Sequence, residues 1–74
     1  MGAPSKGGPF GQVIRRNIQA CRSRSGLSQA SLSEKCGLSL EKLTNYEQGQ
    51  GIPSIDELTR IATCLGVPMS DLIG

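Results

Sequence analysis

Residues 27–49 read LSQASLSEKCGLSLEKLTNYEQG, and this stretch decides the fold. Ser28 has the side chain of a helix N-cap, and Leu32 and Cys36 lie four positions apart, on one face of the helix that would follow. Gly37 can end that helix, because a residue without a Cβ adopts the left-handed backbone conformation without a steric clash. The pattern predicts a first short helix.

A second short helix is predicted directly after Gly37. Ser39 has the chemistry of another N-cap, Leu43 and Tyr46 continue an inward-facing stripe, and Gly49 marks the end. Because so few residues separate the two helices, the chain must turn sharply between them. This is the helix-turn-helix arrangement, whose second helix can lie in a DNA major groove.

Helical periodicity continues on the N-terminal side of this stretch. From Phe10 onward, Ile14, Ile18 and Cys21 follow the i, i+4, i+7 pattern, and Gly26 provides a stop. Residues 1–9 carry three glycines and two prolines without apolar periodicity, so we expect a disordered arm or a remnant of cloning there.

On the C-terminal side, Ser54 and Glu57 form the pattern of a capping box, which predicts a helix ending at Gly66. A final turn follows. No segment shows period-two alternation, so the predicted fold is all-α, a compact five-helix bundle with one domain over residues 10–74 and its motif at about 29–48. The apolar residues of the last two helical segments are Leu58, Ile61, Ala62, Leu65, Met69, Leu72 and Ile73.

Composition excludes several classes of function. The 74 residues include no histidine and no tryptophan, so Ser-His-Asp triads and histidine-ligated zinc sites are ruled out. Neither a carboxylate pair at recognisable spacing nor a phosphate-binding loop is present, and we expect no enzyme, no cofactor and no metal. Three cysteines without a C-x-x-C pair indicate small buried hydrophobes rather than a disulfide framework. No apolar run spans a membrane and no signal core is visible, so we expect a cytoplasmic protein.

Charge is unevenly distributed along the chain. The net charge is +2, but residues 1–33 hold five basic and no acidic side chains, whereas residues 34–74 hold three basic and six acidic ones. This asymmetry is compatible with a face that meets phosphates, although a solvated charged surface is the commoner explanation.

The chain resembles the lambdoid phage repressor and Cro family, also called the xenobiotic-response-element-type helix-turn-helix family. The resemblance extends from about Ile18 to Ile73. It rests on an ordered series of short matches: Leu27-Ser28-Gln29, Leu32, Gly37, Tyr46-Glu47-Gln48-Gly49, Pro53-Ser54, Ile61-Ala62, Leu65-Gly66-Val67 and Asp71-Leu72.

The resemblance implies contacts to the DNA backbone. Gln29 matches a glutamine that family members place against phosphate, and Arg22 matches an arginine that pairs with the glutamate represented here by Glu47. The alternative for Arg22 and Glu47 is two unrelated solvated charges. The expected backbone contacts are Ser28, Gln29, Arg22, Lys42, Gln48 and Gln50; Lys42 can equally be a solvated lysine.

The resemblance also implies which residues face base edges: Ser39, Leu40, Glu41 and Asn45. Asn45 can pair with adenine, Glu41 can accept from cytosine N4, and Leu40 can touch a thymine methyl. Each has a structural alternative. Leu40 lies three residues before Leu43 and fits the margin of the core, Glu41 suits the positive end of the helix dipole, and Asn45 suits an exposed helical position.

These observations predict a transcriptional regulator that binds double-stranded DNA as a homodimer, because so small a unit contacts few base pairs. We expect the dimer surface to include Met69, Leu72 and Ile73, which could instead close the core. The alternative function is a helix-turn-helix-shaped protein-interaction module, or an antitoxin-like protein with a protein partner. The low net charge and the acidic residue on the second helix motivate it.

Overall fold

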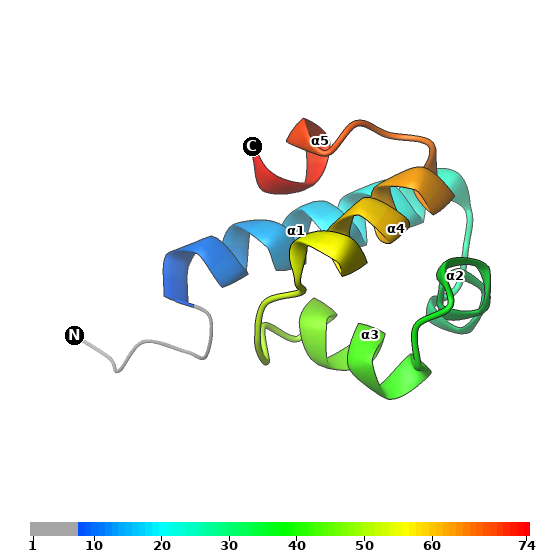
Figure 1. The fold of residues 1–74 in the computed structure, drawn as a ribbon, viewed down its shortest axis with the longest axis horizontal. Helices are drawn as coiled ribbons and strands as arrows, with labels where there is room; N and C mark the ends of the chain where they lie inside the picture. Colours follow the sequence, from blue (N-terminus) through cyan, green and yellow to red (C-terminus); the bar gives the residue numbers. More distant parts are fainter. Residues whose placement is uncertain (1–7) are drawn as a thin grey trace.

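The computed structural model describes residues 8–74, with side chains from Gly11 onward, and five helices account for its regular structure (Figure 1). No strand occurs among the described residues, as the periodicity predicts. The helices are α1 (Gly8–Ser25), α2 (Gln29–Cys36), α3 (Leu40–Glu47), α4 (Ile55–Leu65) and α5 (Ser70–Ile73).

The N-terminal boundary differs from the prediction. Residues 1–7 of the expected arm lie outside the described residues, but Gly8 and Pro9 belong to α1, so the first helix begins two residues earlier than expected. A proline fits the first turn of a helix, because the N–H that it lacks would have no partner within the helix there.

Serine caps fix the starts of three helices. The Ser28 Oγ accepts from the Ser31 N–H at 3.0 Å, and the Ser39 Oγ accepts from the Lys42 N–H at 3.1 Å. Ser54 forms the predicted capping box, in which each partner's side chain accepts from the other's backbone N–H. Local side-chain chemistry therefore defines these boundaries.

The turn between α2 and α3 depends on one glycine. Gly37 has φ +71°, a conformation in which a Cβ would be strained, and its N–H donates to the Ser33 carbonyl. At the other end of α3 the helix stops at Glu47, and Gln48 occupies the C-cap position. The helix therefore ends one residue earlier than the predicted end at Gln48, just before Gly49.

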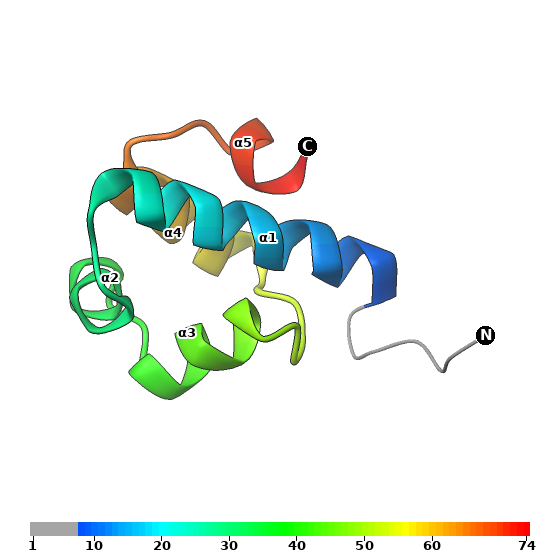
Figure 2. The same ribbon diagram turned by 180° about the vertical axis from the view of Figure 1, so that it is seen from behind.

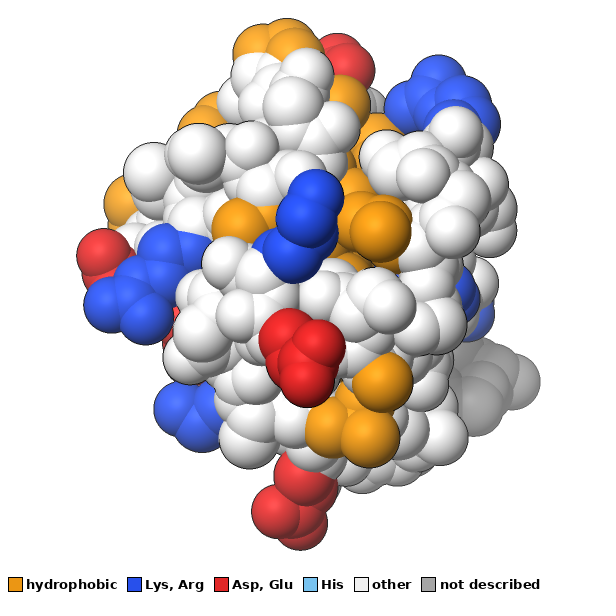
Figure 3. Space-filling view, turned by 90° about the vertical axis from the view of Figure 1, so that its right-hand side faces the viewer, with side chains coloured by type: hydrophobic (Ala, Val, Ile, Leu, Met, Phe, Trp, Pro, Cys, Tyr) orange, Lys and Arg blue, Asp and Glu red, His pale blue; other side chains and the backbone are white. Residues whose placement is uncertain are grey.

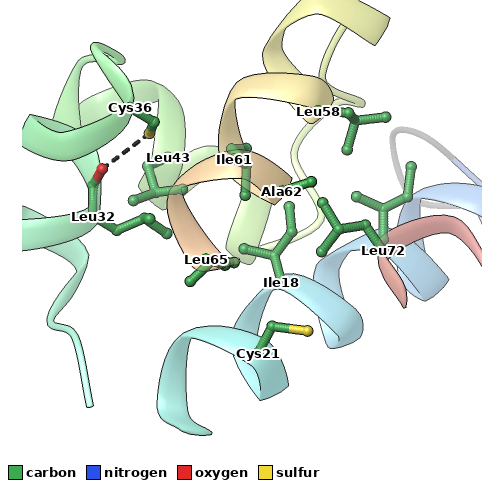
Figure 4. Packing of buried hydrophobic residues seen from close by; sticks show 11 residues of the cluster. Ile18, Cys21, Leu32, Cys36, Leu43, Leu58, Ile61, Ala62, Leu65 and Leu72 are labelled. Atoms are coloured by element: carbon green, nitrogen blue, oxygen red, sulfur yellow. Dashed lines mark hydrogen bonds between the residues drawn. The ribbon is translucent and has the colours of Figure 1, made fainter. Parts of the chain in front are cut away.

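The core lies between α1 and α4, with α3 below them, α5 above and α2 at one end (Figures 1 and 2). α1 packs against α3 and α5, while α2 packs against α3 and α4. The buried apolar side chains come from all five helices and converge in one cluster (Figure 4). Cys21 and Cys36 belong to this cluster, as predicted, whereas Cys64 is half-buried at its edge.

The C-terminal turn closes the core over α1. Leu72 is 0% exposed, and its carbonyl accepts from Asn17 Nδ2 at 2.8 Å. The expectation that Leu72 lies on a dimer surface is therefore wrong, because the side chain fills the core instead. Met69 is half-buried against the same cluster, and Ile73 remains 40% exposed.

Candidate nucleic-acid interface

α3 has one buried face and one polar face. Leu43 and Glu47 point into the domain, whereas Glu41, Asn45 and Gln48 are exposed and lie four and three positions apart, on a common side. Because the buried pair fixes the rotation of the helix, the exposed residues form a defined row of hydrogen-bonding side chains. Such a row is what the base edges of a major groove require.

The N-terminus of α3 adds two more of the expected residues to this surface. Ser39 is exposed, and Leu40 is 47% exposed. The core interpretation of Leu40 is wrong, since its side chain is not among the hydrophobic residues packed against the cluster. An exposed apolar side chain beside polar ones is suited to contact with a thymine methyl.

A buried carboxylate ties α3 to α1. The side chain of Glu47 is 2% exposed. Arg22 donates two parallel hydrogen bonds to its carboxylate, from Nε to Oε2 at 2.8 Å and from Nη2 to Oε1 at 3.0 Å. Arg22 Nη1 also donates to the Leu27 carbonyl at 2.9 Å. This bidentate geometry is the strong form of an arginine–carboxylate pair. Arg22 and Glu47 are thus not the two solvated charges of the alternative interpretation.

The same carboxylate also holds Gln29, at the start of α2. Gln29 Nε2 donates to Glu47 Oε1 at 3.0 Å, and Thr44 Oγ1 donates to Gln29 Oε1 at 3.4 Å. The Gln29 amide therefore connects the two helices of the motif, a role that sequence reasoning missed. Its expected contact with phosphate stays a prediction.

A second carboxylate links α3 to α4. Glu57 Oε1 accepts from the Tyr46 hydroxyl at 2.7 Å and from the Ser54 N–H at 3.1 Å, while Lys42 Nζ lies 3.1 Å from Oε2. Sequence reasoning found the Ser54–Glu57 capping box but neither of the two contacts to α3. Lys42 is mostly exposed, so it remains near the surface although its ammonium is paired.

Tyr46 provides a direct test of the link to α4. Burial and the hydrogen bond to Glu57 raise the pKa of Tyr46 to about 12, and the same bond lowers the pKa of Glu57. Tyr46 is the only tyrosine and there is no tryptophan, so phenolate absorbance reports this group alone.

We expect the phenol to titrate near pH 12, and Glu57→Gln to lower this midpoint only in part, because burial is the larger cause. Since the folded pKa is the raised one, the stability from this group is complete below pH 10 and is lost as pH rises from about 10 to 12. Titration of the folded protein at the ordinary value for tyrosine would contradict the contact.

On the face of the molecule shown in Figure 3, the basic residues do not form one patch. At the end of the molecule where α2 lies, basic, acidic and apolar side chains are separated by uncharged polar surface (Figure 3). Three of the basic side chains form ion pairs: Arg22 with Glu47, Lys42 with Glu57, and Arg60 with Asp56. The other four basic side chains of residues 11–74 have no carboxylate partner.

Residues 8–74 contain neither a membrane-spanning helix nor a cluster of metal ligands. No described helix combines the length and apolar character needed to cross a bilayer. No group of three metal-ligating side chains comes together in this part of the chain.

The fold and the exposed face of α3 define a helix-turn-helix domain. A helix-turn-helix family model matches residues 18–72, and the chain belongs to this family, in its lambdoid repressor and Cro-type form. The family consists of transcriptional regulators that bind DNA.

Two relatives illustrate the similarity in sequence. The chain is 30% identical over 61 residues to the cryptic phage CTXphi transcriptional repressor RstR of Vibrio cholerae, which covers 82% of this chain and 54% of the repressor. It is 34% identical over 64 residues to the control protein C.BamHI of Bacillus amyloliquefaciens, covering 86% of this chain and 75% of that protein. The chain thus spans about half the length of the phage repressors it matches.

Two solved structures have the same fold. A hypothetical transcription factor, NHTF, from Neisseria superposes with a TM-score of 0.84 at 25% identity, covering 88% of this chain and 75% of that one. The restriction-modification controller protein C.AhdI from Aeromonas hydrophila superposes with a TM-score of 0.78 at 27% identity, covering 81% of this chain and 91% of that one.

Proposed function

We propose that this chain binds specific duplex DNA through α3 and acts as a cytoplasmic transcriptional regulator. The observation that carries the proposal is the exposed row of Glu41, Asn45 and Gln48 on a helix whose opposite face is anchored by the buried Glu47. A helix held in this way presents its polar side chains in a fixed orientation, which reading of base edges requires.

In this proposal α3 enters the major groove. Asn45 makes a bidentate pair with adenine, Glu41 accepts from cytosine N4, and Leu40 contacts a thymine methyl. Ser39 retains its hydroxyl proton as a donor, because its oxygen serves as the cap acceptor. Because the Glu41 carboxylate repels phosphate, we expect this side chain to lie deep in the major groove, away from the DNA backbone.

Backbone contacts would position the domain without reading sequence. Gln29 and Ser28 stand at the first turn of α2, where backbone N–H groups favour an anion. The other proposed contacts are Arg22, Lys42, Gln48 and Gln50. Lys42 would leave its exposed ion pair with Glu57 and bind a phosphate instead. The free-energy cost is modest, because surface ion pairs contribute little to stability.

We further propose a homodimer that reads two half-sites, since one unit contacts only a few base pairs. Relatives named as a transcriptional repressor and as control proteins support a regulatory role. With Leu72 in the core, the remaining candidates for the dimer surface are Met69 and Ile73.

The second candidate function is a protein-interaction module with a protein partner. It is favoured by the paired state of Lys42 and by the acidic Glu41 on the exposed face of α3, both of which weaken attraction to DNA. The two functions differ in their response to salt, because binding to duplex DNA releases counterions.

Selection of binding sites from random duplexes, followed by titration at several salt concentrations, tests the proposal. We expect one enriched site with two related halves, and affinity that falls steeply as salt rises. Sedimentation with and without the selected duplex would show two copies per site. A pool without enrichment, together with salt-independent or undetectable binding, would favour the interaction module.

A further inference from the structure

Arg15 lies against the backbone where α3 ends. Its side chain leaves α1 and passes over Gly49, so that a Cβ built on Gly49 would stand 3.4 Å from Arg15 Cδ and 3.7 Å from Nε. Gly49 is buried, whereas its neighbours Gln48 and Gln50 are exposed. The guanidinium is therefore adjacent to the segment that leads from α3 to α4.

This connecting segment carries no charge of its own. Residues 48–53 read QGQGIP, although they flank the surface proposed to meet DNA. Four basic side chains of the described chain lack a carboxylate partner, and among these Arg15 is the one that lies beside the Cβ position of Gly49. The four are Arg15, Arg16, Arg24 and Lys35.

The guanidinium of Arg15 is held in place and still has donors to offer. Its Nε and Nη2 both donate to Gln12 Oε1, at 3.1 and 2.9 Å. A guanidinium has five N–H donors, so three remain for a further acceptor. Because Gln12 is neutral, it orients the Arg15 guanidinium without cancelling its positive charge. A guanidinium that is already oriented loses less conformational entropy when it binds a phosphate.

We propose that Arg15 binds a phosphate of the DNA backbone beside Gln48 and Gln50, so that α1 supplies the positive charge that the connecting segment lacks. The inference rests on the proposed function. It adds a positively charged contact at the C-terminal end of α3, where the other proposed backbone contacts, Gln48 and Gln50, are neutral. Residues of α1, α2 and α3 would then contact the DNA backbone on several sides of α3, the helix that lies in the major groove.

The test compares Arg15→Gln with Arg16→Gln by titration of the selected duplex and a scrambled duplex at several salt concentrations. We expect Arg15→Gln to reduce the steepness of the salt dependence by about 0.9 for each bound copy, and to weaken binding about eightfold per copy at 0.1 M salt, equally on both duplexes. Arg16 is exposed and points about 100° away around α1, so the same loss of charge there should leave the slope unchanged.

A second variant, Gln12→Glu, keeps the guanidinium and places a carboxylate where the neutral acceptor stands. We expect its salt dependence to match that of Arg15→Gln, because the charge is then neutralised in place. Thermal unfolding checks that all three variants remain folded.

Equal slopes for the Arg15 and Arg16 variants, with salt-dependent binding by the unmodified protein, would overturn the contact and leave the proposed function intact. If the unmodified protein itself shows no salt-dependent binding to duplex DNA, the proposed function and this contact fall together.

Discussion

Arg22→Ala is expected to lower the free energy of unfolding by about 3–5 kcal/mol, because it leaves the buried carboxylate of Glu47 without its main partner. A domain of this length has about 4–11 kcal/mol in total, so much of its stability would be lost. Urea denaturation followed by circular dichroism measures the change. DNA affinity should fall as well, since α3 loses its tie to α1.

The matched control is Arg16→Ala, which removes an exposed arginine from the same helix and should change stability by less than about 0.5 kcal/mol. Replacing the pair together, Arg22→Met with Glu47→Leu, should recover much of the loss, because no buried charge then remains unpaired. A loss for Arg22→Ala no greater than that of the control would show that the ion pair does not hold the domain together.

Asn45→Ala is expected to weaken binding to the selected duplex by about 1–3 kcal/mol and to relax the preference at one position in each half-site. Its side chain is exposed and forms no hydrogen bond in the described structure, so stability should not change. Titration against the selected and the scrambled duplex measures the effect. The scrambled duplex should be bound almost as before.

Gln29→Ala provides the contrast. A lost phosphate contact weakens binding to every duplex equally, and because glutamine is neutral the salt dependence should scarcely change. Since Gln29 also holds Glu47, its stability must be measured alongside. Equal losses on both duplexes for Asn45→Ala would remove Asn45 from the base-reading set and shift that role to Leu40 and Glu41.

The helix boundaries could be predicted because the signals that set them are local. Ser28, Ser39 and Ser54 each accept from a backbone N–H three residues ahead, a contact that depends on almost nothing outside its own turn. The clearest difference lies at an end without such a side-chain signal, because α1 begins at Gly8 rather than at Phe10.

Contacts between distant residues could be predicted only where the family resemblance supplied them, as for Arg22 and Glu47. Nothing in the spacing of Tyr46 and Glu57, or of Gln29 and Glu47, indicates that they meet, because the crossing of the helices brings them together. Leu72 shows the same limit. The position of Leu72 in the sequence fits an exposed or a buried side chain equally. Only the packing of α5 on α1 determines that the side chain is buried.

The closure of α5 over α1 also bears on how the protein is made. Leu72 is the core residue that is synthesised last, and its backbone bond to Asn17 spans 55 positions of sequence. A growing chain therefore cannot complete its core until this residue has left the ribosome, and contacts of such long range form slowly. Loss of the final turn would therefore uncover the apolar side of α1 against which α5 packs.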